Sequence, residues 1–238
     1  MNDISQFSTQ NDILTSLSDA SLKRLIPILE HVELPRGQVL YRADEVISHV
    51  YFPDRAMISV VAYTEHGQGA EVSVIGCEGA TGLDVILGAD RSSNENITQM
   101  ADGAYRIKTT DVRAEFAKGG ELNLLLLKFV RKLIVQMSQT ALCNRLHSTE
   151  MRLSRWLLMC HDRSNSDVMQ LTQEFIALML GANRTTVTMT AIALQNAGFI
   201  SYKRGTITII DRKGLEEFTC PCYSTIRAAY GSDFPRSK

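Results

Sequence analysis

The sequence predicts an α+β fold: an N-terminal antiparallel β domain, one long helix and a C-terminal winged helix-turn-helix. Three patterns indicate this fold: short β-rich runs punctuated by turns from residue 34 to about 110, unbroken helical periodicity over residues 120–146, and two capped helices followed by a hairpin over residues 171–209. A chain of 238 residues is long enough for two domains. We therefore expect the segments 1–118, 119–147 and 148–238.

The N-terminal segment changes its pattern at Leu34. Before this point, apolar residues at helical spacing follow Ser18, a good N-cap, and predict helical structure up to residue 33, with Pro27 as a point that can divide it. After it, β-rich runs at 38–41, 49–52, 57–63 and 72–75 alternate with turns that contain Gly or Pro. Short runs without intervening helices predict an antiparallel sandwich or barrel, not βαβ units.

The long helix is expected over residues 120–146, which contain no Pro and no Gly after Gly120. Its apolar residues recur at helical spacing and form a wide stripe: Leu122, Leu125, Leu126, Phe129, Leu133, Val135, Met137 and Leu142. A stripe this wide predicts a helix that packs on its own domain on one side and on a second subunit on the other. We therefore expect a homodimer held together by residues 120–146.

Residues 171–200 predict two helices separated by a sharp turn. Thr172 and Asn183 are N-cap residues, and Gly181 between them suits a left-handed backbone. Apolar residues one turn apart predict the inward face of both helices: Ile176, Ala177, Leu180, Val187, Ala191 and Leu194.

The outward side of the second helix predicts DNA recognition. Its first turns correspond to the part of a recognition helix that enters the major groove. An Arg there can donate two hydrogen bonds to guanine, and Thr and Met methyl groups can pack on the thymine methyl group. The candidate base-reading residues are Arg184, Thr185, Thr188 and Met189. The candidate phosphate contacts are Thr172, Gln173, Asn183, Thr186, Lys203 and Arg204.

The residues after the second helix support the same interpretation. Gly198 ends that helix, and residues 200–209 alternate like a hairpin with the basic tip Lys203-Arg204. Residues 148–238 hold 11 Lys and Arg against 8 Asp and Glu, a net charge of +3, whereas the rest of the chain holds 14 against 18, a net charge of −4. The basic hairpin and the charge shift favour double-stranded DNA as a partner. The alternative is an αα-hairpin that only carries an exposed Arg.

These residues give the chain a resemblance to the Crp/Fnr superfamily of transcriptional regulators. It covers nearly the whole length and rests on residues 34–38 (LPRGQ), the helix 120–146, residues 152–158 (RLSRWLL) and residues 171–200. The resemblance implies that the N-terminal part is a β-roll similar to a cyclic-nucleotide-binding domain, that the long helix dimerises, and that the winged helix binds a two-fold symmetric site. It also implies RNA polymerase as a further partner.

The recognition helix departs from that of the catabolite-activator members. Those proteins read bases with an Arg, a Glu at the next position and a second Arg one turn later, and the matching residues here are Arg184, Thr185 and Met189. Because only the first Arg is kept, the resemblance implies the same docking on a different DNA sequence.

The β-roll also departs from the pattern that binds a cyclic nucleotide. Gly82 matches the Gly of the Gly-Glu pair that holds the ribose, but Leu83 stands in place of Glu. The nearest Arg-Ser pair, Arg91-Ser92, lies slightly too early to match the pair that holds the phosphate. We therefore expect no control by cAMP. Two alternatives stay open: a gap that brings Arg91 into the pocket, and a plain surface turn at residues 91–94.

The cysteines and histidines do not predict a metal site or a catalytic site. Cys220 and Cys222 are close in sequence, but the other three cysteines lie in different elements, and the five histidines show no close ligand pair. A zinc or iron–sulfur site needs four ligands at recognisable spacing. We expect no metal, no cofactor and no enzymatic activity, with Cys143 and Cys160 as small buried hydrophobic residues.

The remaining composition is that of a cytoplasmic protein. No apolar run is long enough to span a bilayer, the first 21 residues lack a signal pattern, and five cysteines form no disulfide framework, so no membrane partner is expected. Two alternatives to a DNA-binding regulator remain: a small-molecule or redox sensor whose β-roll ligand gates DNA binding, and an enzyme with a metal or redox centre at Cys220 and Cys222.

Overall fold

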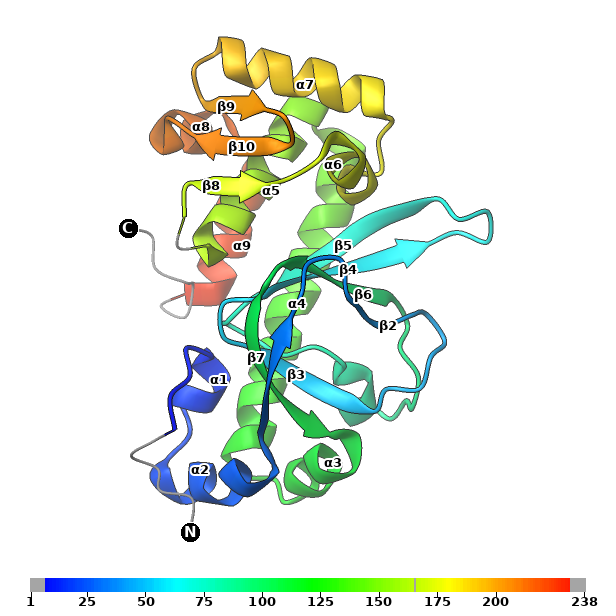
Figure 1. The fold of residues 1–238 in the computed structure, drawn as a ribbon, viewed down its shortest axis with the longest axis vertical. Coiled ribbons are helices and arrows are strands. Elements are labelled where there is room, and N and C mark those ends of the chain that lie inside the picture. Colours follow the sequence, from blue (N-terminus) through cyan, green and yellow to red (C-terminus); the bar gives the residue numbers. More distant parts are fainter. Residues whose placement is uncertain (1–6, 165, 232–238) are drawn as a thin grey trace. The chain divides into compact units, whose positions relative to one another are not determined.

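Short helices and a first strand begin the described chain. The computed structural model, drawn in Figure 1, describes residues 7–164 and 166–231. Helix α1 (Asp12–Thr15) precedes α2 (Asp19–Leu25), and the Ser18 side chain caps α2 by accepting a hydrogen bond from a backbone N–H, as predicted. Pro27 lies in the 3-10 turn η2 (Ile26–Ile28) that ends the helical part. The prediction of helix up to residue 33 is wrong, because β1 (Glu30–Leu34) follows and pairs with a later strand.

The β domain contains two antiparallel sheets. One has the order β1-β7-β3 and the other the order β2-β6-β4-β5. All four predicted runs are strands: β2 (Val39–Tyr41), β3 (His49–Pro53), β4 (Met57–Tyr63) and β5 (Gly69–Ile75). Two further strands follow, β6 (Glu95–Met100) and β7 (Asp102–Lys108). The first five residues of β4 are all buried, so this strand is covered on both faces.

Two short helices complete the β domain, and its interior is apolar. The 3-10 helix η3 (Leu83–Ile86) follows Gly82, and α3 (Thr109–Ala117) follows β7. Val50, Phe52 and Ile58 are fully buried. Burial of side chains of this size stabilises the fold by roughly 1.5–3 kcal/mol each.

Helix α4 (Glu121–Leu146) has 26 residues and two opposite apolar faces. One face is buried and includes Leu122, Leu126, Phe129 and Leu133. At about 100° per residue, the exposed apolar residues lie on the opposite side of the helix. They are Leu124, Leu127, Ile134 and Leu142, which are 54%, 44%, 58% and 45% exposed. We call these four residues the outer face of α4.

The described chain divides into two compact units. The first contains residues 1–60 and 75–134, and the second contains residues 61–74 and 135–238. The hairpin of β4 and β5 therefore groups with the C-terminal residues instead of the rest of the β domain. The division into segments 1–118, 119–147 and 148–238 that the sequence suggests stays a prediction.

The second unit combines helices with a three-stranded sheet of order β8-β10-β9. The first helix that begins within this unit is α5, which reaches Arg163. The elements are α5 (Thr149–Arg163), β8 (Val168–Gln170), α6 (Gln173–Leu180), α7 (Arg184–Asn196), β9 (Ile200–Lys203), β10 (Thr206–Ile209), α8 (Arg212–Phe218) and α9 (Cys222–Tyr230).

A buried carboxylate lies near the C-terminal end of α5. Asp162 is 4% exposed; Arg212 donates a hydrogen bond to it over 2.5 Å and the Tyr223 hydroxyl donates another over 3.0 Å. Burial raises the pKa of Asp162, and the charge of Arg212 opposes that rise. The hydrogen bonds that Asp162 accepts from Arg212 in α8 and Tyr223 in α9 hold both helices on the end of α5.

The hairpin at residues 61–74 is held by polar contacts within the second unit. The indole N–H of Trp156 in α5 donates a hydrogen bond of 2.8 Å to a carboxylate oxygen of Glu71. The Gln136 side chain in α4 donates to the carbonyl oxygen of Val74 over 3.1 Å. The hairpin is therefore part of the packing around α5.

Within the described residues, no single helix is long and apolar enough to cross a membrane. Helices α6 and α7 taken together are long and apolar enough to meet the same criterion, but the chain bends by 102° between them.

Candidate nucleic-acid interface

Helices α6 and α7 form the predicted helix-turn-helix. Thr172 accepts a hydrogen bond from the backbone N–H of Phe175, and Asn183 accepts one from Thr186, so both predicted N-caps are present. Gly181 has φ +57°, the left-handed conformation predicted for the turn. The bend of 102° lies in the range of helix-turn-helix motifs.

The inward face of this motif is buried largely as predicted. Val187, Ala191 and Leu194 are 0–1% exposed in α7, and Ile176 and Leu180 are buried in α6. Ala177 is only half-buried. Because these apolar residues fix the rotation of α7, they determine which of its residues face solvent.

The opposite face of α7 carries the predicted base-reading residues. Arg184, Thr185 and Met189 are exposed, and the Met189 side chain is 63% exposed although it is apolar. Thr188 is half-buried, and its hydroxyl donates a hydrogen bond of 3.0 Å to the Arg184 carbonyl. The Thr188 oxygen can therefore still accept a hydrogen bond, but its proton is engaged within the helix.

The hairpin of β9 and β10 is the predicted wing. Its two-residue loop, Arg204-Gly205, has φ +48° and +78°, the pattern of a type I′ turn. Lys203 pairs with Thr206 across the turn, and both Lys203 and Arg204 are exposed. The basic tip is therefore held by a turn whose geometry matches the strand twist.

The beginnings of α6 and α7 and the tip of the wing meet at one open groove. The groove has a volume of about 380 Å³ and is lined by Thr172, Gln173, Glu174, Arg184, Tyr202, Arg204 and Gly205. The structure thus brings together four of the predicted contacts from three separate elements. Lys203, Asn183 and Thr186 lie on these same elements but do not line the groove.

Glu174 is a member of this groove that sequence reasoning did not single out. Its carboxylate forms an ion pair of 2.8 Å with the Arg184 guanidinium, and Gln173 accepts a hydrogen bond of 3.2 Å from Arg184 Nε. The side chains of Arg184 and Glu174 are 66% and 62% exposed, so the pair is in contact with solvent. In the sequence, the signal that could have indicated this ion pair is an acidic residue in the first turn of α6.

Comparisons with known proteins agree with this geometry. Residues 151–218 match the family model of the Crp-like helix-turn-helix domain. Residues 151–218 therefore form a Crp-like helix-turn-helix domain. No curated protein matches the chain in sequence.

Solved structures share the fold of this chain. A protein assigned to the crp/fnr family from Eubacterium rectale has a TM-score of 0.69 at 15% identity, over 87% of this chain and 96% of that one. FixK2 from Bradyrhizobium japonicum has a TM-score of 0.69 at 14% identity, over 81% and 98%. The c-di-GMP responsive regulator CLP from Xanthomonas campestris has a TM-score of 0.66 at 13% identity, over 82% and 100%.

The four residues that the sequence suggests for a nucleotide pocket, Gly82, Leu83, Arg91 and Ser92, have different surroundings in the structure. Gly82 has φ +75°, and a Cβ there would lie 2.8 Å from the Tyr41 hydroxyl. Leu83 is 7% exposed and belongs to the core. Arg91 is exposed and donates a hydrogen bond of 2.5 Å to the Asp44 carbonyl, and Ser92 is buried and donates one of 2.6 Å to the Asn94 carbonyl.

The structure brings three of the five cysteines together, which the sequence analysis did not anticipate. Cys143 near the end of α4 lies beside Cys220, which precedes α9, and Cys222, which begins it; His147 joins these cysteines. Cys143 and Cys160 are fully buried, as predicted. The spacing of four residues between Cys143 and His147 is the local signal in the sequence that could have indicated this cluster.

Proposed function

We propose that this chain regulates transcription by binding a two-fold symmetric DNA operator as a homodimer. The observation that carries the proposal is the exposed face of α7, where Arg184, Thr185 and Met189 face solvent opposite a buried apolar face. In a docked complex this face enters the major groove, and Arg184 donates two hydrogen bonds to a guanine. Lys203 and Arg204 of the wing contact the DNA backbone.

The remaining predicted contacts orient the motif on DNA. Thr172 and Gln173 begin α6, and Asn183 and Thr186 begin α7, where backbone N–H groups and the helix dipole favour a phosphate oxygen. Contacts of this kind fix the position of α7 but carry no sequence information. Thr188 adds an acceptor oxygen to the base-reading face.

The outer face of α4 supports the homodimer. Four large apolar side chains are exposed on one side of a helix whose opposite side is buried. A second copy of the same helix would cover both faces symmetrically, as is usual in two-fold dimers. Two recognition helices would then meet half-sites about 34 Å apart, one turn of the DNA helix.

The β-roll supports regulation without cAMP. A phosphate in a buried pocket needs a cationic partner. Among the described residues of the first unit no Lys or Arg is buried, and Arg91 is bonded to Asp44 at the surface. RNA polymerase as a partner, and the absence of enzymatic activity, are further parts of the proposal that follow from the type of protein.

The test is selection of bound sequences from a random duplex pool, with purified protein and no added ligand. An enriched palindrome with half-sites one helical turn apart is the expected result. Enrichment that appears only after cAMP is added would contradict the cAMP-independent part. Enrichment that appears only with cell extract would favour the alternative, a sensor whose β-roll ligand gates DNA binding.

A further inference from the structure

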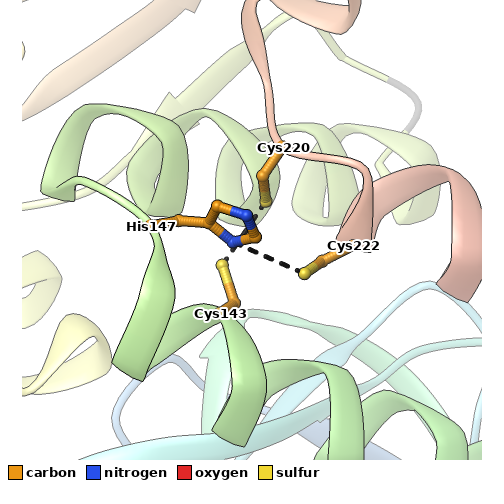
Figure 2. A group of neighbouring side chains, drawn as sticks. All are labelled: Cys143, His147, Cys220 and Cys222. Atoms are coloured by element: carbon orange, nitrogen blue, oxygen red, sulfur yellow. Dashed lines mark hydrogen bonds between the residues drawn. The ribbon is translucent and has the colours of Figure 1, made fainter.

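Four side chains with metal-binding atoms converge in the second unit. The sulfur atoms of Cys143, Cys220 and Cys222 and a ring nitrogen of His147 all lie within 4.8 Å of one another. Figure 2 shows the four side chains pointing toward a common centre. Cys143 lies in the last turns of α4 and His147 directly follows that helix, whereas Cys222 begins α9 and Cys220 lies two residues before it. We propose that Cys143, His147, Cys220 and Cys222 bind one zinc ion.

The distances between the ligand atoms suit a single tetrahedral ion. Zn–S bonds of about 2.3 Å and Zn–N bonds of about 2.0–2.1 Å place tetrahedral ligands about 3.8 Å apart for two sulfurs and about 3.6 Å apart for sulfur and nitrogen. Here the sulfurs of Cys143 and Cys220 are 3.4 Å apart, and Cys222 Sγ is 3.6 Å from His147 Nδ1. The first distance is far longer than a disulfide bond of about 2.05 Å.

The spacing of the residues along the chain holds them in place. Cys143 lies in α4 and His147 directly follows it, but the backbone N–H of His147 still donates a hydrogen bond of 3.1 Å to the Cys143 carbonyl. The two residues are four apart and so lie on one side of the helix end. Cys220 and Cys222 flank Pro221, which fixes the backbone where α9 begins. The packing of the end of α4 against the start of α9 therefore assembles the complete ligand set.

The closed ligand set distinguishes a structural ion from a catalytic one. Four protein ligands leave no position for a substrate, and three sulfurs with one nitrogen form a set that zinc favours. The three cysteines are 0–2% exposed. An iron–sulfur cluster would place its own iron and sulfide atoms between the cysteines and would need a wider cavity.

A buried arginine supplies independent support. Arg155 is 4% exposed; its Nη1 contacts the Thr140 hydroxyl at 3.3 Å and the Met159 sulfur at 3.2 Å, and its Nε has no partner. Among the described residues no carboxylate pairs with it. The charge of Arg155 acts on Cys143 and Cys222, which places the guanidinium beside the cluster. Zinc with three thiolates and a neutral imidazole has a net charge of −1, which balances the guanidinium.

Elemental analysis of the full-length protein tests the proposal directly. Protein from zinc-containing medium, purified with a thiol reductant, should contain about one zinc per chain and no iron. Mass spectrometry after denaturing alkylation should find all five cysteines reduced. Iron with acid-labile sulfide, or metal-free protein with a disulfide between Cys143 and Cys220, would overturn the assignment.

Variants locate the ion. Cys220→Ser should lose the zinc, whereas Cys77→Ser, at a cysteine outside the cluster, should retain it. His147→Cys should also retain zinc, because it exchanges one ligand for another. Full zinc content in Cys220→Ser would refute this ligand set.

Cobalt substitution keeps the test valid if Cys220→Ser does not fold. Replacing the metal of the wild-type protein with Co²⁺ should give the intense visible bands of a tetrahedral site and sulfur-to-cobalt charge-transfer bands. The charge-transfer bands should grow in His147→Cys because a fourth thiolate is added. A cobalt spectrum of octahedral type would rule out the proposed site.

Discussion

Arg184 is the residue on which sequence recognition should depend most strongly. We expect Arg184→Ala to relax the preference at one base pair of each half-site by about 1–3 kcal/mol, because a bidentate contact with guanine is lost. Competitive binding to duplexes that vary at single positions would measure this change. Lys213→Ala is the matched control, since that side chain is 87% exposed on α8, away from the groove. An unaltered preference in Arg184→Ala would mean that α7 docks differently.

Arg212 is the residue on which the stability of the second unit should depend. We expect Arg212→Met to lower the free energy of unfolding by about 3–5 kcal/mol, because Asp162 is left as a buried charge without its cation. Thermal or urea unfolding would measure the loss. Lys213→Met, next in sequence and exposed, should have little effect.

The same pair predicts a dependence on pH. Without Arg212, burial should raise the pKa of Asp162 further above its unfolded value, so the folded state binds the proton more tightly. A group of this kind contributes most to stability at low pH, and the contribution is lost as pH rises through the folded pKa. The loss in Arg212→Met should therefore be smaller in acid than at neutral pH. A loss that does not change with pH would contradict the assignment to Asp162.

At the scale of the element, the turn between α6 and α7 depends on Gly181. Its φ of +57° is unfavourable for a side chain, and an added Cβ would lie 3.1 Å from the Ala70 Cβ in the β4–β5 hairpin. We expect Gly181→Ala to destabilise the folded protein by about 1–2 kcal/mol. Gly120→Ala is the control, because a Cβ there meets no atom within 4 Å and the residue precedes a helix. Equal melting temperatures for the two variants would contradict the strain at Gly181.

At the scale of the whole molecule, the outer face of α4 should determine the oligomeric state. We expect Leu127→Glu with Ile134→Glu to give a monomer, because each apolar side chain contributes roughly 1.5–3 kcal/mol when buried between subunits. Light scattering would measure the mass. DNA affinity should fall on the order of 100-fold or more, because the two half-sites are no longer bound together.

The control for the dimer is Leu87→Glu, which places the same charge on a side chain that is 61% exposed outside α4. It should leave the mass and the DNA affinity unchanged. A dimer that survives the double substitution in α4 would place the subunit interface elsewhere.

Local patterns predicted most of the fold and of the candidate interface formed by α6, α7 and the wing. The caps Thr172 and Asn183, the turn at Gly181 and the long helix are set by residues close in sequence, so they can be recognised there. β1 was missed because its strand character depends on pairing with β7, which is distant in sequence.

The same limit applies to the sites. The pairing of Glu174 with Arg184 depends on how α6 crosses α7, and the cysteine cluster depends on how α9 packs on α4. Tertiary contacts of this kind produce no repeating pattern of residues in the sequence. A spacing of four residues between Cys143 and His147 was the one local signal, and it becomes informative only beside Cys220 and Cys222.

The hydrogen bond between Trp156 and Glu71 gives the protein an internal optical probe. The chain contains one tryptophan, which is 2% exposed and holds the β4–β5 hairpin against α5. The tryptophan fluorescence of the protein, excited where tyrosine does not absorb, therefore arises from a single indole at that contact. Its emission should shift to longer wavelength whenever the hairpin leaves α5 and water reaches the ring, so a ligand or an operator that moves the hairpin can be detected without any added dye.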